Sequence, residues 1–281
     1  MAHYRIRTLE LGYTEQFPAD FSFDGYVFSG ETMYNPFSMT LLQGEGKNIL
    51  VDCGFDMRNP VKQGIYTASY AANGHGPDEV LSTAGLAPED IDAVILTHLH
   101  WDHAGGTACF PKAVFYLQRE ELEGWLKITG DPATYRALYF RSLDVNDLTA
   151  IKKLENQGRL ILFDGEKDDV FPGISIRVSR LAHSFAQQII YIKQDTDVYL
   201  IVGDVCNRPE NLLGTKDFPF FIPNPKFAVG TPVNAVQDYK RIMSWVGGDV
   251  NKVVMTHDGT RRIRCPETKT DLGLSIYEIC P

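Results

Sequence analysis

The chain has 281 residues, of which 44% are hydrophobic, so it is long enough to bury a sizeable core. Its formal net charge of -9 argues against a nucleic-acid partner, because such proteins neutralise phosphates with clustered lysine and arginine. The first residues lack the apolar run of a signal peptide, and no stretch approaches the ~18 apolar residues of a membrane span. These features predict a cytoplasmic location and no membrane partner.

The first half of the chain begins with a predicted β-hairpin. Residues 39–43 and 48–52 are strand-like and flank a Gly-Glu-Gly turn, which is typical of paired antiparallel strands. A short helix is expected over Pro77–Ala84, because proline and two acidic residues open its first turn. Residues 92–96 read DAVIL, and the apolar run after the aspartate predicts a buried strand that leads into Thr97 and His98.

Helical signals then extend from about residue 119 to 157, with a break at Gly130-Asp131-Pro132. A further helix is expected over Val236–Val246, where two glycines follow. No repeat, low-complexity tract or linker divides the sequence. We therefore expect residues 1–281 to form a single domain with a helical insertion at about 119–157.

The second half repeats the pattern of paired strands. Residues 188–193 and 198–202 predict another hairpin, and the strand-like runs 174–179 and 252–255 each lead towards a histidine. Strand pairs separated by helices indicate sheet packed on sheet with helices outside. The predicted fold class is therefore a layered α/β or α+β arrangement.

The cysteines indicate reduced thiols. They are odd in number and form no CxxC pair, which argues against a disulfide framework and against cysteine-based zinc binding. The five are Cys53, Cys109, Cys206, Cys265 and Cys280. Cys206 is interpreted as a packed thiol rather than a nucleophile.

Residues 97–106 read THLHWDHAGG and hold three of the seven histidines in the chain. His98, His100, Asp102 and His103 follow a buried strand and can point at a common centre. Imidazole and carboxylate ligands suit zinc, and also manganese, iron or cobalt. Four potential ligands within six positions favour a metal site over an ordinary polar loop.

Three further candidates lie at the ends of predicted strands, namely His183, Asp204 and His257. Each alone is more typical of a satisfied histidine or a turn aspartate, but the first cluster needs partners. Together the seven groups suffice for two metal ions with a water between them. We expect the first ion to bind His98, His100 and His183, the second to bind Asp102, His103 and His257, and Asp204 to bridge them.

The stretch 97–106 resembles the signature of the metallo-β-lactamase superfamily. His183, Asp204 and His257 fall in the order of that family, and the resemblance extends from Asp52 to Asp258. It implies an αββα sandwich with a dinuclear metal site at one edge, and it assigns the same seven ligands. Zinc is the most typical metal of such a site.

Within the superfamily the chain is most similar to the N-acyl-homoserine lactonases and the pyridoxolactonase-like enzymes. The likeness rests on the N-terminal lead-in through Leu42, on Asp102 within a full HxHxDH, and on the helical insertion. His100 stands where the flavodiiron branch carries glutamate, which disfavours redox chemistry. Glyoxalase II-like thioesterases share a similar string and remain a rival, and a homodimer is common among relatives.

The chain departs from this branch at two places. Residues 182–187 read AHSFAQ, where the family has a Gly-His-Thr/Ser-Pro-Gly-His context. Asn207 occupies the position where acyl-homoserine lactonases place a tyrosine that helps to bind the lactone. Asn207 either donates a hydrogen bond to the substrate instead or caps a turn before Arg208. The expected substrate is therefore a lactone in general rather than one particular lactone.

These observations predict a metal-dependent hydrolase that opens a lactone or related ester of a small molecule through a bridging hydroxide. Asp102 is expected to orient that hydroxide and to pass a proton to the leaving alkoxide. The alternatives are a thioesterase, an amidase or a phosphodiesterase on the same scaffold. A non-catalytic metal-binding module is less expected, because none of the ligands is missing.

Loops are expected to form the walls around the substrate. The candidates are residues 55–76, with Tyr66 and Tyr70, and residues 217–227, with several phenylalanines, although such aromatics are more typical of a core or a dimer contact. The basic run Arg261–Arg264 is interpreted as a solvated loop, with attraction of an anionic group as the alternative.

Overall fold

Two β-sheets form the centre of the molecule in the computed structural model, which describes residues 2–24, 27–28, 30–59, 72–140, 142–224 and 229–280. The first sheet has eight strands in the order β12-β13-β1-β2-β3-β4-β5-β6. Their bounds are β1 Tyr4–Pro18, β2 Thr32–Gly44, β3 Lys47–Val51, β4 Ala93–Ile95, β5 Val114–Gln118, β6 Leu160–Phe163, β12 Glu267–Lys269 and β13 Ser275–Cys280.

The second sheet has five strands in the order β11-β10-β9-β8-β7. Their bounds are β7 Lys167–Phe171, β8 Ile174–Arg180, β9 Ala186–Gln194, β10 Asp197–Ile201 and β11 Val253–Val254. Both predicted hairpins are confirmed, as β2 with β3 and as β9 with β10.

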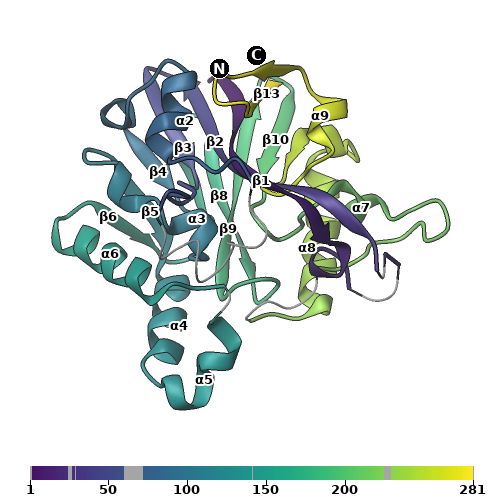
Figure 1. Cartoon of the computed structure of the whole chain (residues 1–281), viewed down its shortest axis with the longest axis horizontal. Helices are drawn as coiled ribbons and strands as arrows, with labels where there is room; N and C mark the ends of the chain where they lie inside the picture. The colour runs from purple at the N-terminus through teal and green to yellow at the C-terminus, as the bar shows by residue number, and fades with distance from the viewer. Residues whose placement is uncertain are drawn as a thin grey trace.

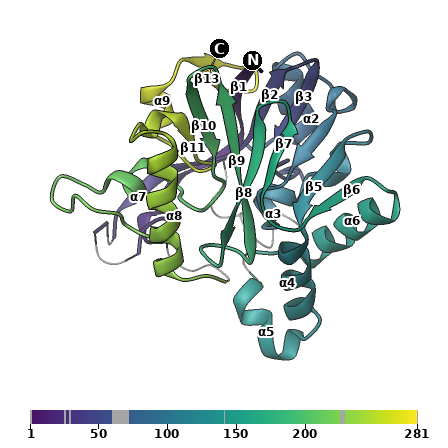
Figure 2. The same cartoon turned by 180° about the vertical axis from the view of Figure 1, so that it is seen from behind.

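Helices lie on the outer sides of the two sheets (Figures 1 and 2). The α-helices are α2 Pro77–Thr83, α3 Trp101–Ala104, α4 Arg119–Thr129, α5 Pro132–Tyr139, α6 Val145–Asn156, α7 Pro209–Leu213, α8 Pro232–Trp245 and α9 Arg261–Arg264. The 3-10 helices are η1 Ala19–Phe21, η2 Pro88–Asp90, η3 Thr107–Cys109 and η4 Val250–Lys252. The layered arrangement predicted from the strand and helix pattern is thereby confirmed. None of the helices in the described ranges is long and apolar enough to cross a membrane.

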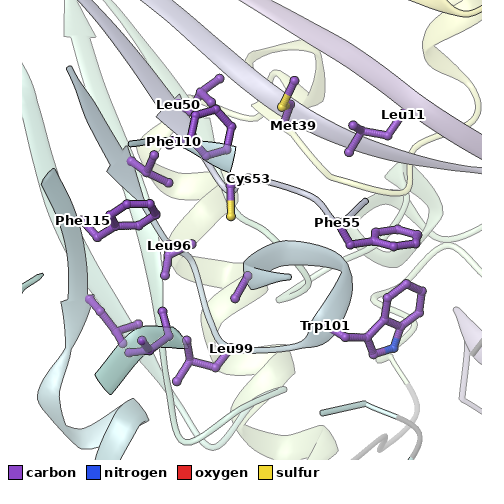
Figure 3. Packing of buried hydrophobic residues seen from close by; sticks show 14 of the residues in the cluster. Leu11, Met39, Leu50, Cys53, Phe55, Leu96, Leu99, Trp101, Phe110 and Phe115 are labelled. Atoms are coloured by element: carbon purple, nitrogen blue, oxygen red, sulfur yellow. The ribbon is translucent and has the colours of Figure 1, made fainter. Parts of the chain in front are cut away.

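Three apolar clusters hold these layers together. The cluster between the sheets draws on both of them and includes Ile6, Val51, Ile95, Ile176, Ile190 and Val254. A second cluster fills the outer face of the first sheet, where Leu50, Leu96 and Phe115 pack near Phe110 (Figure 3). A third joins α8 to the second sheet through Tyr239 and Ile242. Cys53 and Cys206 are fully buried in the second and third clusters, and burial raises the pKa of both thiols, as expected of packed cysteines.

The helical region from 119 to 157 contains three helices rather than one interrupted stretch. α4 ends at Thr129, and Pro132 opens α5 because proline at the first helical position costs no hydrogen bond. Asp131 and Asp144 cap α5 and α6 with their side chains. The helix expected from Val236 begins earlier, at Pro232, because the Thr231 side chain accepts a hydrogen bond from the Asn234 N–H.

β1 was not predicted as a strand, although it runs for 15 residues and pairs with both β2 and β13. Its sequence lacks the alternation of a half-buried strand because polar residues on it are buried as well. Glu10, for example, accepts hydrogen bonds from the Tyr34 and Tyr277 hydroxyls and from the Ser275 N–H. The partners that make such burial tolerable come from distant parts of the chain.

Parallel pairing brings the predicted site residues to one edge of the two sheets. β3 pairs in parallel with β4, so Asp52 and Thr97 follow neighbouring strand ends. β10 pairs in parallel with β11, so the segments that lead to Asp204 and His257 also leave the second sheet side by side. The carboxyl ends of parallel strands are a common place for a binding site.

Candidate metal centre

The HxHxDH motif lies partly in an extended loop and partly in a single helical turn. His98 and His100 precede α3, whereas Asp102 and His103 lie within it. All four side chains are buried, and His98 and His103 are inaccessible to solvent. The loop and the helical turn therefore direct the side chains before and after His100 into one interior space.

The structure brings all seven predicted residues together. Three overlapping groups have ligand atoms within 4.8 Å of one another, namely His98, His100 and His183; His98, His103 and Asp204; and Asp102, His103 and His257. The first and third groups match the two sets expected from the sequence. Asp204 of the second group lies beside histidines of both sets.

The atoms that face one another in this cluster are imidazole nitrogens and carboxylate oxygens. His183 Nε2 lies 3.0 Å from His100 Nδ1, and His103 Nε2 lies 3.3 Å from Asp204 Oδ1. His257 Nε2 lies 3.3 Å from Asp204 Oδ2, which in turn lies 3.7 Å from His183 Nε2. One carboxylate thus contacts histidines of both groups.

These separations fit metal ligation. Ligand atoms held at about 2.0–2.1 Å around one tetrahedral zinc lie about 3.3 Å from each other. His98 Nε2 is buried and has no hydrogen-bond partner among the described residues. Buried polar atoms without a partner are costly unless something ligates them, so the donor set fits two divalent cations.

The first histidine group is held neutral. Burial lowers the pKa of His98 and of His100 well below the usual histidine range, and neighbouring histidines lower it further. Burial also lowers the pKa of His183 to about 4, although the Asp204 carboxylate opposes this shift. Neutral imidazole is the form that ligates a metal ion.

The second group carries protons in the metal-free chain. Burial disfavours a charged His257, but the carboxylates of Asp204 and Asp102 raise its pKa to about 10. The pKa of His103 is also raised well above its usual range, because the Asp204 and Asp52 carboxylates raise it by more than burial lowers it. Conversely, His257 and His103 hold the pKa of Asp204 well below its usual range despite burial. Bound cations would take the place of these protons.

We expect the metal-free protein to be most stable near pH 6.5. Below that pH the unfolded chain protonates its histidines while folded His183 stays neutral down to a pKa of about 4, so stability falls as the pH falls. Above it, the stability supplied by protonated His257 is lost as the pH rises towards about 10. Urea unfolding of chelator-treated protein between pH 4 and pH 10 measures this, and a flat profile contradicts it.

A family model described as the metallo-beta-lactamase superfamily matches residues 36–241. The chain belongs to this superfamily. The resemblance noted from the THLHWDHAGG stretch is thus confirmed, and so is the sandwich fold that it implied.

Individual relatives and solved structures agree with this membership. The N-acyl homoserine lactonase AiiA of Bacillus thuringiensis subsp. kurstaki is 23% identical over 245 residues, which cover 84% of this chain and 86% of the relative. The structure of an N-acyl homoserine lactone hydrolase with the product N-hexanoyl-L-homoserine at its catalytic metal center superposes with a TM-score of 0.70 at 21% identity, covering 95% of this chain and 98% of the other. AidC, a dizinc quorum-quenching lactonase, has a TM-score of 0.65 at 17% identity, with 92% and 91% covered.

Asp52 contributes to the site, and the sequence did not reveal this. It adopts a positive φ of 60°, which is uncommon for a residue other than glycine. Its carboxylate accepts hydrogen bonds from Thr97 N at 2.7 Å and from Thr97 Oγ1 at 2.9 Å, and lies 2.7 Å from His103 Nδ1. The contact fixes the ring so that Nε2 faces the cluster.

Replacing Asp52 by asparagine is expected to weaken metal binding by about 10- to 100-fold, because a carboxylate that orients a ligand histidine typically contributes that much. A competition titration of the metal-free variant with Zn²⁺ and a chromophoric chelator measures the change. Asp164→Asn, at an exposed carboxylate that pairs with Arg119, serves as the matched control. Equal affinities for the Asp52 variant and the control contradict the assigned role.

The loop histidine His257 is oriented by backbone and amide groups of β2. Its Nδ1 lies 2.8 Å from the Pro36 carbonyl oxygen and 3.3 Å from Asn35 Nδ2. The Phe37 ring also packs edge-on against the imidazole at a centroid distance of 5.6 Å. These contacts leave Nε2 to face Asp102 and Asp204.

Asn207 is only 5% exposed, and it shares a hydrogen-bonding partner, Asn224, with the backbone of Asp204. Its side-chain oxygen accepts a hydrogen bond from Asn224 Nδ2 at 3.1 Å, and the same amide donates to the Asp204 carbonyl oxygen. The turn before α7 is capped by Asn211 Oδ1, which accepts from the Asn207 and Arg208 N–H groups. Asn211 therefore caps the turn, and Asn224 holds the Asn207 side chain.

The expected substrate walls need revision at Phe55. Phe55 is fully buried and packs edge-on against Trp101 at 4.5 Å, so it belongs to the core (Figure 3). Tyr66 and Tyr70 lie outside the described residues. Phe220 is 59% exposed and contacts Phe218 at 5.8 Å.

The basic run 261–264 is not a simple solvated loop. Arg261 is buried, and Arg264 forms an ion pair with Asp258, which follows the loop histidine. The Arg262 guanidinium lies over the Tyr34 ring at 4.8 Å. Two of the three arginines thus support the loop that carries His257.

Proposed function

We propose that this protein is a metal-dependent hydrolase that opens the ring of a small-molecule lactone. The observation that carries the proposal is the position of the Asp204 carboxylate, whose two oxygens face histidines of both ligand groups. Two divalent cations held there, most typically Zn²⁺ with Mn, Fe or Co as alternatives, would supply an activated water and polarise a carbonyl. The lactonases among the relatives support a lactone as the substrate class.

Seven residues would hold these cations in the proposed site. His98, His100 and His183 form the first group, Asp102, His103 and His257 form the second, and Asp204 joins them. The centre is largely shielded from bulk solvent, because all of these residues are at most 8% exposed. Such an interior strengthens every electrostatic interaction with a developing oxyanion.

Asp102 has the role of proton carrier in this proposal. It is the most exposed of the seven residues, and its Oδ2 lies 3.2 Å from His257 Nε2. The carboxylate therefore lies where it can orient the attacking water and hold the proton that this water releases. When the ring opens, Asp102 delivers the proton to the leaving alkoxide oxygen.

Asn207 is the proposed substrate-binding residue. Asn224 holds the carbonyl end of its side chain, and the amide end, which is a donor, is assigned to the substrate carbonyl in this proposal. Asn207→Ala is expected to lower kcat/KM for a lactone by about 10-fold, the value of one hydrogen bond of about 1.4 kcal/mol. Metal content should stay at the wild-type value, and the exposed Asn156→Ala variant should match wild type. An unchanged kcat/KM removes Asn207 from the site.

A substrate screen tests the function itself. A pH-indicator assay with purified, metal-analysed protein would compare γ-lactones with and without an N-acyl chain, thioesters, amides and phosphodiesters. We expect acid release from lactones, abolished by chelation and restored by Zn²⁺. Preferential hydrolysis of a thioester, an amide or a phosphodiester would replace lactone opening with that reaction on the same scaffold. A metal-filled protein inert towards every class would point to a non-catalytic module.

A further inference from the structure

Glu121 is a buried carboxylate outside the predicted ligand set. It lies in the first turn of α4 and is inaccessible to solvent. Its oxygens accept hydrogen bonds from Leu99 N at 3.1 Å, Trp125 Nε1 at 2.7 Å, Ala186 N at 2.8 Å and the Ser184 hydroxyl. A buried carboxylate is tolerable only with such a set of donors, so this network is well satisfied.

Two of these donors, Leu99 and Ser184, come from the two loops that carry the first histidine group. Leu99 lies between His98 and His100, and Ser184 follows His183 directly. The two loops are far apart in the chain, since 83 positions separate His100 from His183. One carboxylate therefore holds both loops at a fixed separation.

The same helix also contacts a ligand ring directly. The Trp125 indole packs against the His100 imidazole at 5.6 Å and 63°, and against Phe185 at 5.2 Å and 88°. A Cβ on Gly124 would lie 2.3 Å from Phe185 Cγ, so only glycine permits this close approach of α4 to the 183–186 loop. α4 thus forms a rigid support behind the first group.

We propose that Glu121 is a positioning residue that sets the geometry of the His98, His100 and His183 group. It does so by fixing the loops that place His183 Nε2 3.0 Å from His100 Nδ1. Within the described ranges, no hydrogen bond joins Glu121 to Asp102, His103 or His257. Its effect is therefore specific to one of the two metal positions. The inference rests on the proposed dinuclear centre.

The test is a metal titration of E121Q. Glutamine keeps one acceptor oxygen but turns an N–H₂ group towards donors, so the network loses part of its bonds. We expect one of the two Zn²⁺ equivalents to bind about 10- to 100-fold more weakly in competition with a chromophoric chelator. The other equivalent should bind as in wild type, and the Co²⁺ spectrum should change for one site only.

Two control variants separate positioning from general destabilisation. E120Q alters the neighbouring carboxylate, which is exposed and pairs with Arg180, and should leave both affinities unchanged. D238N removes a buried carboxylate that bonds Arg241 within α8, and should lower Tm without changing metal binding. Should E121Q fail to fold, Ser184→Ala removes a single donor and is expected to weaken the same equivalent.

The outcomes are distinguishable. Two unchanged affinities in E121Q overturn the inference and leave the proposed function intact. An equal loss of both equivalents, with a fall in Tm like that of D238N, also overturns it, because the effect is then global. A wild-type chain that binds fewer than two equivalents overturns the dinuclear centre and the inference together.

Discussion

Asp204→Ala is expected to lose both metal ions and nearly all hydrolytic activity. Its carboxylate is the group that faces histidines of both sets, so its removal leaves neither position complete. It also removes the negative charge that balances protonated His103 and His257 in the metal-free chain. We expect less than one metal equivalent by elemental analysis and a fall of about 10³-fold or more in lactone hydrolysis.

The control for this experiment is Asp164→Ala, at the exposed carboxylate that pairs with Arg119. That variant should keep the metal content and activity of wild type. Circular dichroism of both variants checks that the fold is intact. Two equivalents of metal in folded Asp204→Ala would falsify the bridging role, whatever the activity.

Asp102→Asn is expected to lower kcat by about 10²- to 10⁴-fold on a lactone, the range typical of a lost proton-transfer group. An amide cannot take up the proton of the attacking water and then deliver it to the alkoxide. The deficit should be much smaller for an aryl ester, because a phenolate leaves without a proton. The measurement is kcat for both substrates at matched metal content.

The comparison between leaving groups distinguishes the loss of proton transfer from the loss of metal. Asp102 also belongs to the second ligand group, so lost metal alone would lower both activities equally. Equal losses on lactone and aryl ester, with two metals bound, would mean that the residue acts as a ligand only. A selective loss on the lactone is the outcome that supports proton delivery.

Local signals in the sequence predicted much of the fold and the centre of the site. The two hairpins were readable because a turn and its flanking strands are adjacent in the chain. The HxHxDH motif was readable for the same reason, since one loop contributes four groups within six positions. The three distant candidates were found through the strands that precede them, and the structure brings them to the same cluster.

The remaining features depend on contacts between distant segments. β1 was missed because its buried polar residues find partners in β2 and β13, which no local pattern indicates. Asp52 was seen only as the end of a hairpin, since its partner His103 is 51 residues away. Glu121 was one acidic residue among several in a helical stretch, until its donors were known.

The sequence by itself determined the layered fold class and the expectation of a metal-dependent hydrolase, and it provided the seven candidate ligands. Ligand type and strand pattern are local properties, so they can be read from short stretches. Only the tertiary structure decided which carboxylate contacts His103, which one ties the two loops of the first histidine group, and which end of the Asn207 side chain is bonded to Asn224. Those relations depend on where separate strand ends and loops meet, and chain packing alone fixes that.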